Sequence, residues 1–137
     1  MAYALDPEVK WHLYSPHGWG SSRDSGKWVF RASTNRQGPI WMRLRQAVLD
    51  RKFVAIMHGN ERVIELNHGQ NVFCVFVPFS DLRTVTLAMI DLRDLGIDEN
   101  LSYKTDSTTL RQTDVGLDEY LWYAEDYSVR PGNTPPK

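Results

Sequence analysis

The sequence predicts an α+β domain in which an antiparallel or mixed sheet carries helices on one face. Two segments, residues 39–51 and 80–95, place apolar side chains at helical spacing. Short apolar segments joined by turns surround them, and several read as hairpins. Helices therefore do not alternate one for one with strands, as they would in a doubly wound sheet.

The first third of the chain is expected to hold strands around a long loop. Residues 11–14 read as a short strand or a docked arm. Residues 15–26 read as a loop because proline, glycine and serine interrupt any regular pattern. Residues 27–32 alternate polar and apolar side chains, which predicts a strand.

A helix is expected from Pro39 to Arg51 or Lys52, after a turn at residues 33–38. Proline suits the first helical position, because its missing N–H would have no partner there. The apolar face of this helix consists of Ile40, Trp41, Leu44, Ala47 and Val48. Basic residues at its end suit the helix dipole.

Three strands and a second helix are expected next. Residues 53–57 and 62–66 read as two strands joined by a turn, and residues 72–77 read as a central strand. In the second helix, Ser80 is a candidate N-cap and Gly96 a candidate left-handed C-cap. Its apolar stripe consists of Leu82, Val85, Met89 and Leu92.

The C-terminal part is expected to begin with a polar strand at residues 101–110. Residues 119–123 read as either a last strand or a short helix that closes one edge. We expect residues 1–130 to form a single domain and residues 131–137, rich in proline and glycine, to form a flexible tail.

Size and composition exclude several classes of function. The 137 residues fit one domain, and 42% hydrophobic and 24% charged residues are usual for a soluble protein. The net charge of −1 gives no global attraction to nucleic acid or to an anionic membrane. No segment has the length and apolarity of a membrane span, and the single cysteine, Cys74, is expected to be a buried, inert thiol. We therefore expect a cytoplasmic protein.

Four segments of the chain resemble an uncharacterised family, that of the basophilic-leukaemia-expressed protein. The segments are Gly26–Trp28, Val75–Asp81, Leu92–Gly96 and Leu101–Asp106. The resemblance covers roughly residues 26–111. It implies a fold like that of the cap-binding translation initiation factor, with a curved, mainly antiparallel sheet backed by two main helices.

The resemblance also implies an activity, because some relatives carry a phosphothreonine-lyase label. Such lyases use a lysine base and a histidine acid beside basic residues that hold phosphate. Lys104 matches the lysine, but this chain has no Lys-Phe-His segment to supply the acid. The cap-binding factors hold a methylated base between two tryptophans, and the sequence does not assign such a pair here.

The candidate ligand-binding residues lie in two parts of the sequence. Lys104 and Asp106 have the same parity on the expected strand, so they project from one face, and Tyr103 projects from the other. Arginine and lysine lie close to tryptophans in residues 19–36, a combination that suits nucleotide recognition. The full predicted set is Lys104, Asp106, Tyr103, Thr108, Lys27, Trp28, Trp19 and Arg23. No catalytic residue is assigned.

Metal and cofactor sites are not expected. The four histidines do not have a metal-ligand spacing, and one cysteine excludes the usual zinc patterns. The chain also lacks a Walker lysine motif and a nucleophile elbow.

Three functions remain open from the sequence. The first is non-catalytic binding of a phosphate-containing ligand, such as a nucleotide, an RNA end or a signalling nucleotide. The second is a phosphothreonine-lyase-like carbon–oxygen lyase with Lys104 as base. The third is a protein–protein interaction module that uses a sheet edge near Trp122. The sequence favours the first.

Overall fold

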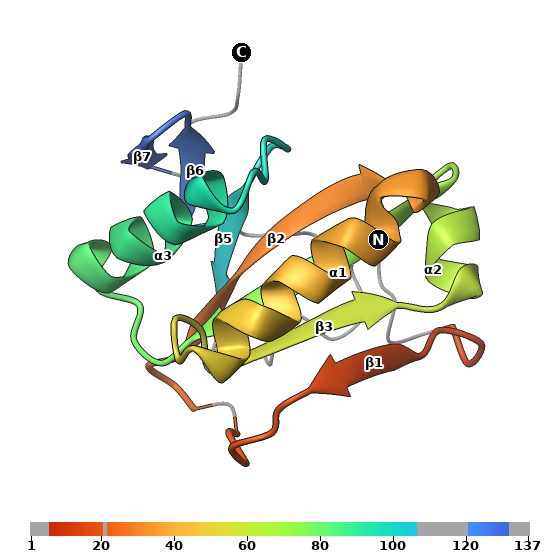
Figure 1. Ribbon diagram of the computed structural model, residues 1–137, viewed down its shortest axis with the longest axis horizontal. Coiled ribbons are helices and arrows are strands. Elements are labelled where there is room, and N and C mark those ends of the chain that lie inside the picture. Colours follow the sequence, from red (N-terminus) through yellow and green to blue (C-terminus); the bar gives the residue numbers. More distant parts are fainter. Residues whose placement is uncertain (1–5, 21, 107–120, 132–137) are drawn as a thin grey trace.

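Seven strands form one curved antiparallel sheet in the computed structural model, which describes residues 6–20, 22–106 and 121–131 (Figure 1). The strands are β1 (Trp11–Tyr14), β2 (Gly26–Ser33), β3 (Ala55–Gly59), β4 (Gln70–Val77), β5 (Ser102–Thr105), β6 (Trp122–Glu125) and β7 (Ser128–Pro131). Their order across the sheet is β1-β3-β4-β2-β5-β6-β7, and every pairing between neighbours is antiparallel. The predicted α+β class with an antiparallel sheet is confirmed.

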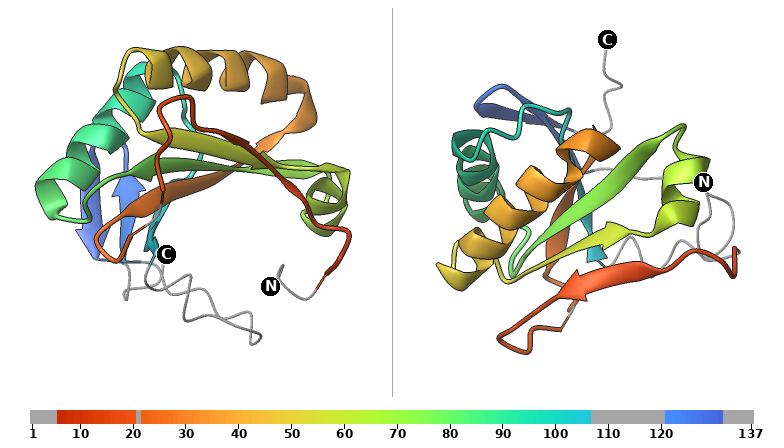
Figure 2. Two further views of the ribbon diagram at one scale, coloured as in Figure 1. Left: turned by 90° about the horizontal axis from the view of Figure 1, so that it is seen from below. Right: turned by 45° about the vertical axis from the view of Figure 1, so that its right-hand side comes forward.

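Three helices accompany the described sheet: α1 (Thr34–Leu49), α2 (Glu61–Leu66) and α3 (Leu82–Asp94). The two longer helices, α1 and α3, lie on the same side of the sheet, and α2 lies at one end of it (Figures 1 and 2). The main core fills the space between these two helices and the sheet, with Trp28 and Tyr103 among its largest fully buried side chains. None of the helices in the described ranges is long and apolar enough to cross a membrane.

A second, smaller cluster lies on the opposite side of the sheet. It consists of Ala55, Val63, Val72, Cys74 and Phe76, with partly buried side chains such as Trp19 packed against it. The sheet is therefore buried on both sides near β4, which explains the continuous apolar run in that strand.

The predicted strand at residues 62–66 is wrong, because these residues form α2. Asn60 is the N-cap, and its side chain accepts a hydrogen bond from the N–H of Val63. Gly59 makes room for the helix, since a Cβ atom there would collide with the Val63 side chain. The β-branched residues of this segment favour a strand locally, and the cap and this close packing overcome that preference.

The predicted start of the first long helix is also wrong. The helix begins at Thr34 after the extended residue Ser33, so Pro39 lies inside it and residues 34–38 are helical. Proline removes one backbone hydrogen bond, the one that its N–H would give to the carbonyl of Asn35. Both residues are exposed, so water can solvate that carbonyl. The helix ends at Leu49, two or three residues before the predicted end at Arg51 or Lys52.

The ends of α3 follow the expected rules with one change of residue. Asp81, not Ser80, is the N-cap, and its carboxylate accepts the N–H of Thr84 at 3.0 Å. Gly96 has φ +87° and follows the last turn, as predicted. Its N–H donates to the carbonyl of Arg93, and that of Ile97 donates to Leu92, which is a Schellman motif.

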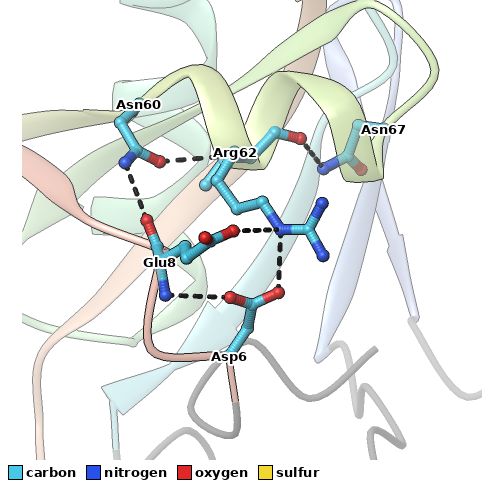
Figure 3. Close-up of polar contacts among 6 residues, drawn as sticks. Asp6, Glu8, Asn60, Arg62 and Asn67 are labelled. Atoms are coloured by element: carbon cyan, nitrogen blue, oxygen red, sulfur yellow. Dashed lines mark hydrogen bonds and ion pairs between the residues drawn. The ribbon is translucent and has the colours of Figure 1, made fainter.

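The N-terminal segment is tied to α2 by a polar cluster (Figure 3). The guanidinium of Arg62 lies 2.9 Å from Asp6 and 3.6 Å from Glu8, and Asn60 donates to the carbonyl of Glu8 at 2.9 Å. These contacts hold the chain that leads into β1 beside the sheet. They lie at the surface, so we treat them as local anchoring and not as a ligand site.

The chain after β5 was predicted only in part. Of the strand predicted at residues 101–110, β5 covers residues 102–105, and residues 107–110 lie outside the described part. Of residues 119–123, Trp122 and Tyr123 lie in strand β6, and residues 119 and 120 lie outside the described part. Its partner β7 extends to Pro131, the first residue of the predicted tail, and residues 132–137 are not described.

Candidate functional site

Strand alternation gives β2 two different faces. Its core side chains under the helices are Trp28, Phe30 and Ala32. Lys27 and Arg31 have the other parity and project from the opposite side of the sheet. We call this side the lysine face, meaning the sheet face opposite α1 and α3.

Two lysines lie directly across from each other on this face. Lys27 of β2 is in register with Lys104 of β5, and both residues are buried, with 7% and 8% of their surface exposed. Gly26 permits this close strand pairing, because a Cβ atom there would collide with the Tyr103 hydroxyl and the Lys104 carbonyl. Directly opposed side chains in an antiparallel pair have Cβ atoms about 5 Å apart, so the two ammonium groups can serve one ligand.

Asp106 and Ser25 complete a buried polar cluster with the lysines. The ammonium of Lys27 donates to one oxygen of Asp106 at 3.0 Å, and the hydroxyl of Ser25 donates to the other at 2.5 Å. The N–H of Asp106 also donates to the carbonyl of Ser25 at 2.9 Å, which joins the end of β5 to the start of β2. Asp106 is 3% exposed and Ser25 is 1% exposed, so this carboxylate is satisfied inside the protein.

An aromatic pair continues the cluster on the other side of Lys27. Phe76 of β4 is the direct cross-strand neighbour of Lys27, and the ammonium lies 5.5 Å from its ring centroid. The indole of Trp19 lies 4.8 Å from the same phenyl ring. Trp19 is only partly buried, so this row leads from the buried lysines to a partly exposed indole. A partly exposed indole at the end of such a row can stack with a planar ring of a ligand.

Cys74 lies on the lysine face but is not a reactive group. Burial raises the pKa of its thiol to about 11, while the nearby Lys27 acts in the opposite direction. A thiol with so high a pKa is almost wholly protonated at neutral pH and is a poor nucleophile. The predicted buried location of Cys74 is confirmed.

Trp28 and Tyr103 are not part of the lysine cluster, because they lie on the helix-covered face of the sheet and have no exposed surface. The indole N–H of Trp28 donates to the carbonyl of Val85 in α3 at 3.0 Å. The hydroxyl of Tyr103 lies 2.9 Å from that of Ser80, and burial raises its pKa. Both are therefore core side chains with satisfied polar atoms.

The remaining predicted residues are only partly brought together. Lys27, Lys104 and Asp106 form the cluster, with Trp19 nearby. Arg23 is exposed in the loop before β2, and Thr108 lies outside the described residues. Ser25 was not predicted, and no local signal could have identified it, because its partner Asp106 lies 81 residues away in the sequence.

The histidines do not join the lysine cluster in the described structure. The ring of His58 packs against Trp41 of α1 at 4.5 Å and lies 4.8 Å from the ring of His12 on β1. Its Nδ1 lies 2.7 Å from the carbonyl of Gly59. Among the residues with described positions, no group of three or more His, Cys, Asp or Glu side chains could hold a metal ion.

The sheet edge expected near Trp122 is formed by β7, which pairs with β6 along its outer side. Trp122 itself lies one strand inside this described edge. Its ring is partly buried and lies 5.7 Å from that of Tyr103, so it packs against the core.

Neither the family models nor the curated proteins compared with this chain gave a match.

Proposed function

We propose that this protein binds a phosphate-containing ligand on the lysine face without catalysing a reaction. The observation that carries the proposal is the cross-strand pair Lys27 and Lys104, buried together beside Asp106 and Ser25. Like charges on directly opposed strand positions destabilise a sheet unless something compensates them. Asp106 forms an ion pair with Lys27, and a phosphate that contacts both ammonium groups would interact favourably with each of them.

A nucleotide or an RNA end is the ligand class that suits the surroundings best. Lysine is a common phosphate ligand, acting as a compact point charge. Trp19 packs against Phe76, whose ring Lys27 also approaches, so a base that stacks on the indole would lie on the same face of the sheet as the lysines. The curved antiparallel sheet backed by helices agrees with the expected likeness to the cap-binding translation initiation factor, and we propose this as the fold family.

The test is a thermal unfolding screen. The panel contains inorganic phosphate, triphosphate, nucleotides, cap analogues and a phosphothreonine peptide. A ligand that binds only the folded state should raise Tm by about 5–10 °C at about one hundred times its Kd. The Lys104→Met variant should remove most of this shift, because it keeps the length of the side chain and deletes its charge.

Lys52→Met is the matched control, because Lys52 is an exposed lysine that follows α1 and is not part of β2 or β5. It should preserve the ligand-induced shift. If no panel member stabilises the protein, or if both variants respond like the wild type, the lysine pair is not the binding site. Phosphate release is followed in parallel, since release from the phosphopeptide would instead support the lyase.

A further inference from the structure

No other described element covers the outward side of α1 (Figure 2), and this side carries two exposed apolar side chains. Met42 and Leu49 are 73% and 49% exposed. They point away from the sheet, because the buried residues of this helix lie on its other side: Ile40, Leu44, Ala47 and Val48. Seven residues separate Met42 from Leu49, which is two helical turns or about 10 Å along the axis. They form one stripe with Gly38 and Gln46, both exposed.

Arginines flank this stripe on both sides. Arg43 reaches toward α3, where its guanidinium donates to the carbonyl of Leu95 at 3.2 Å. Arg45 reaches the other way, and its guanidinium lies 4.8 Å from the ring centroid of Tyr14 on β1. The helix itself contains no acidic residue. Three exposed charged residues follow it: Asp50, whose carboxylate accepts a hydrogen bond from Gln46, and the basic residues Arg51 and Lys52.

We propose that this side of α1 binds an acidic amphipathic helix of a partner protein. Apolar residues of that helix would cover Met42 and Leu49, and its flanking carboxylates would face Arg43 and Arg45. This is the helix-on-helix form of recognition, in which anchors repeat at helical spacing. The charges are complementary, which favours both specificity and rate of association.

Other occupants fit the same surface less well. A second copy of α1 would place arginines against arginines, and like charges oppose such pairing. A nucleic acid would use the arginines and leave Met42 and Leu49 without partners. An anionic membrane requires a broad apolar face, and most of the apolar face of α1 is turned into the core.

The probe is a fluorescein-labelled helical peptide with leucines at positions i, i+3, i+4 and i+7 and glutamates beside them. Its binding to the full-length protein is measured by fluorescence anisotropy. We expect the double variants Met42→Ser with Leu49→Ser and Arg43→Glu with Arg45→Glu each to weaken binding at least about tenfold, the scale of a hot-spot loss. Circular dichroism and Tm establish that the variants fold.

The matched control is Leu87→Ser with Arg83→Glu, which makes the same changes at exposed positions of α3. It should bind the peptide like the wild type. The proposal is overturned if the peptide does not bind, if a version with serine for leucine binds equally well, or if the control loses as much affinity. It is also overturned if an RNA oligonucleotide or phosphatidylserine vesicles bind in its place and depend on Arg43 and Arg45 alone.

Discussion

Asp106 joins the end of β5 to residues 25–27 through two carboxylate oxygens and one backbone N–H. One oxygen accepts from Lys27, the other from Ser25, and the N–H donates to the Ser25 carbonyl. A buried ion pair of this kind adds little net stability over an apolar pair, yet breaking it leaves a buried charge without compensation. Loss of Asp106 is therefore expected to destabilise the fold mainly because it removes a charge partner of the buried Lys27. The strength of each individual hydrogen bond matters less.

The Asp106→Ala variant should lower the free energy of unfolding by about 3 kcal/mol, the scale for removing one partner of a buried ion pair. Urea denaturation followed by tryptophan fluorescence measures this change. Asp98→Ala serves as the control, because Asp98 is exposed, and should change stability by less than about 0.5 kcal/mol. Equal losses in the two variants would mean that the buried cluster has no special structural role.

The pairing of edge strand β1 with β3 places two imidazoles against each other. His12 and His58 are directly opposed, and the half-buried His58 also contacts α1 through Trp41. Burial is the main cause that lowers the pKa of His58, and the nearby His12 adds to it, while the Gly59 carbonyl raises it. The folded state therefore binds a proton on His58 less readily than the unfolded chain does.

Because the pKa of His58 is lower in the folded state than in the unfolded chain, we expect the free energy of unfolding to decrease as the pH falls into the acidic range. Above the unfolded pKa of about 6.5 His58 is neutral in both states, and below it the unfolded chain gains the proton first, so the free energy of unfolding decreases. His58→Gln should flatten this dependence between pH 7 and pH 5, as measured by urea denaturation at each pH. His17→Gln, at an exposed loop position, should leave it unchanged. An unaltered profile in His58→Gln would assign the acid sensitivity to other groups.

The sequence correctly predicted the elements whose own residues carry a clear alternation, an apolar run or a helix-ending glycine. The strands β2 and β4 alternate or run apolar in the sequence, and the glycine after α3 marks the end of that helix. Two errors came from local preferences that tertiary packing overcame. Residues 61–66 favour a strand by composition, but the Asn60 cap and the packing of Val63 on Gly59 make them helical. Pro39 suits a helix start, but this helix begins five residues earlier.

The candidate site was predictable only within one strand. The shared parity of Lys104 and Asp106 follows from β alternation, and both lie in the cluster. The sequence grouped Lys27 with Arg23 and Trp28 because they are neighbours along the chain. Their true partners depend on the register between β2 and β5, which joins Lys27 to Lys104 across 77 residues. Local patterns do not specify such a long-range register, so Ser25 and Phe76 had no signal.

At the scale of the whole molecule, the sheet separates two surfaces of different chemistry. One face carries the buried lysine pair beside Trp19 and Phe76, and the other supports α1 with its exposed apolar and basic side (Figure 2). The two proposals therefore use different parts of the chain. One concerns a small anion, and the other a helix of a partner protein, so each can fail without the other.

The measurement that tests the central claim most directly is a titration of the ¹⁵N-labelled protein with the most stabilising phosphate ligand. Amide chemical shifts are followed by NMR. We predict the largest changes at residues 25–29, at the start of β2, and at residues 102–106, which include β5, around Lys27 and Lys104, and almost none along α1. The Lys104→Met variant should lose these changes. Shifts centred on another part of the sheet or on α1, or shifts preserved in Lys104→Met, would contradict ligand binding by the lysine pair.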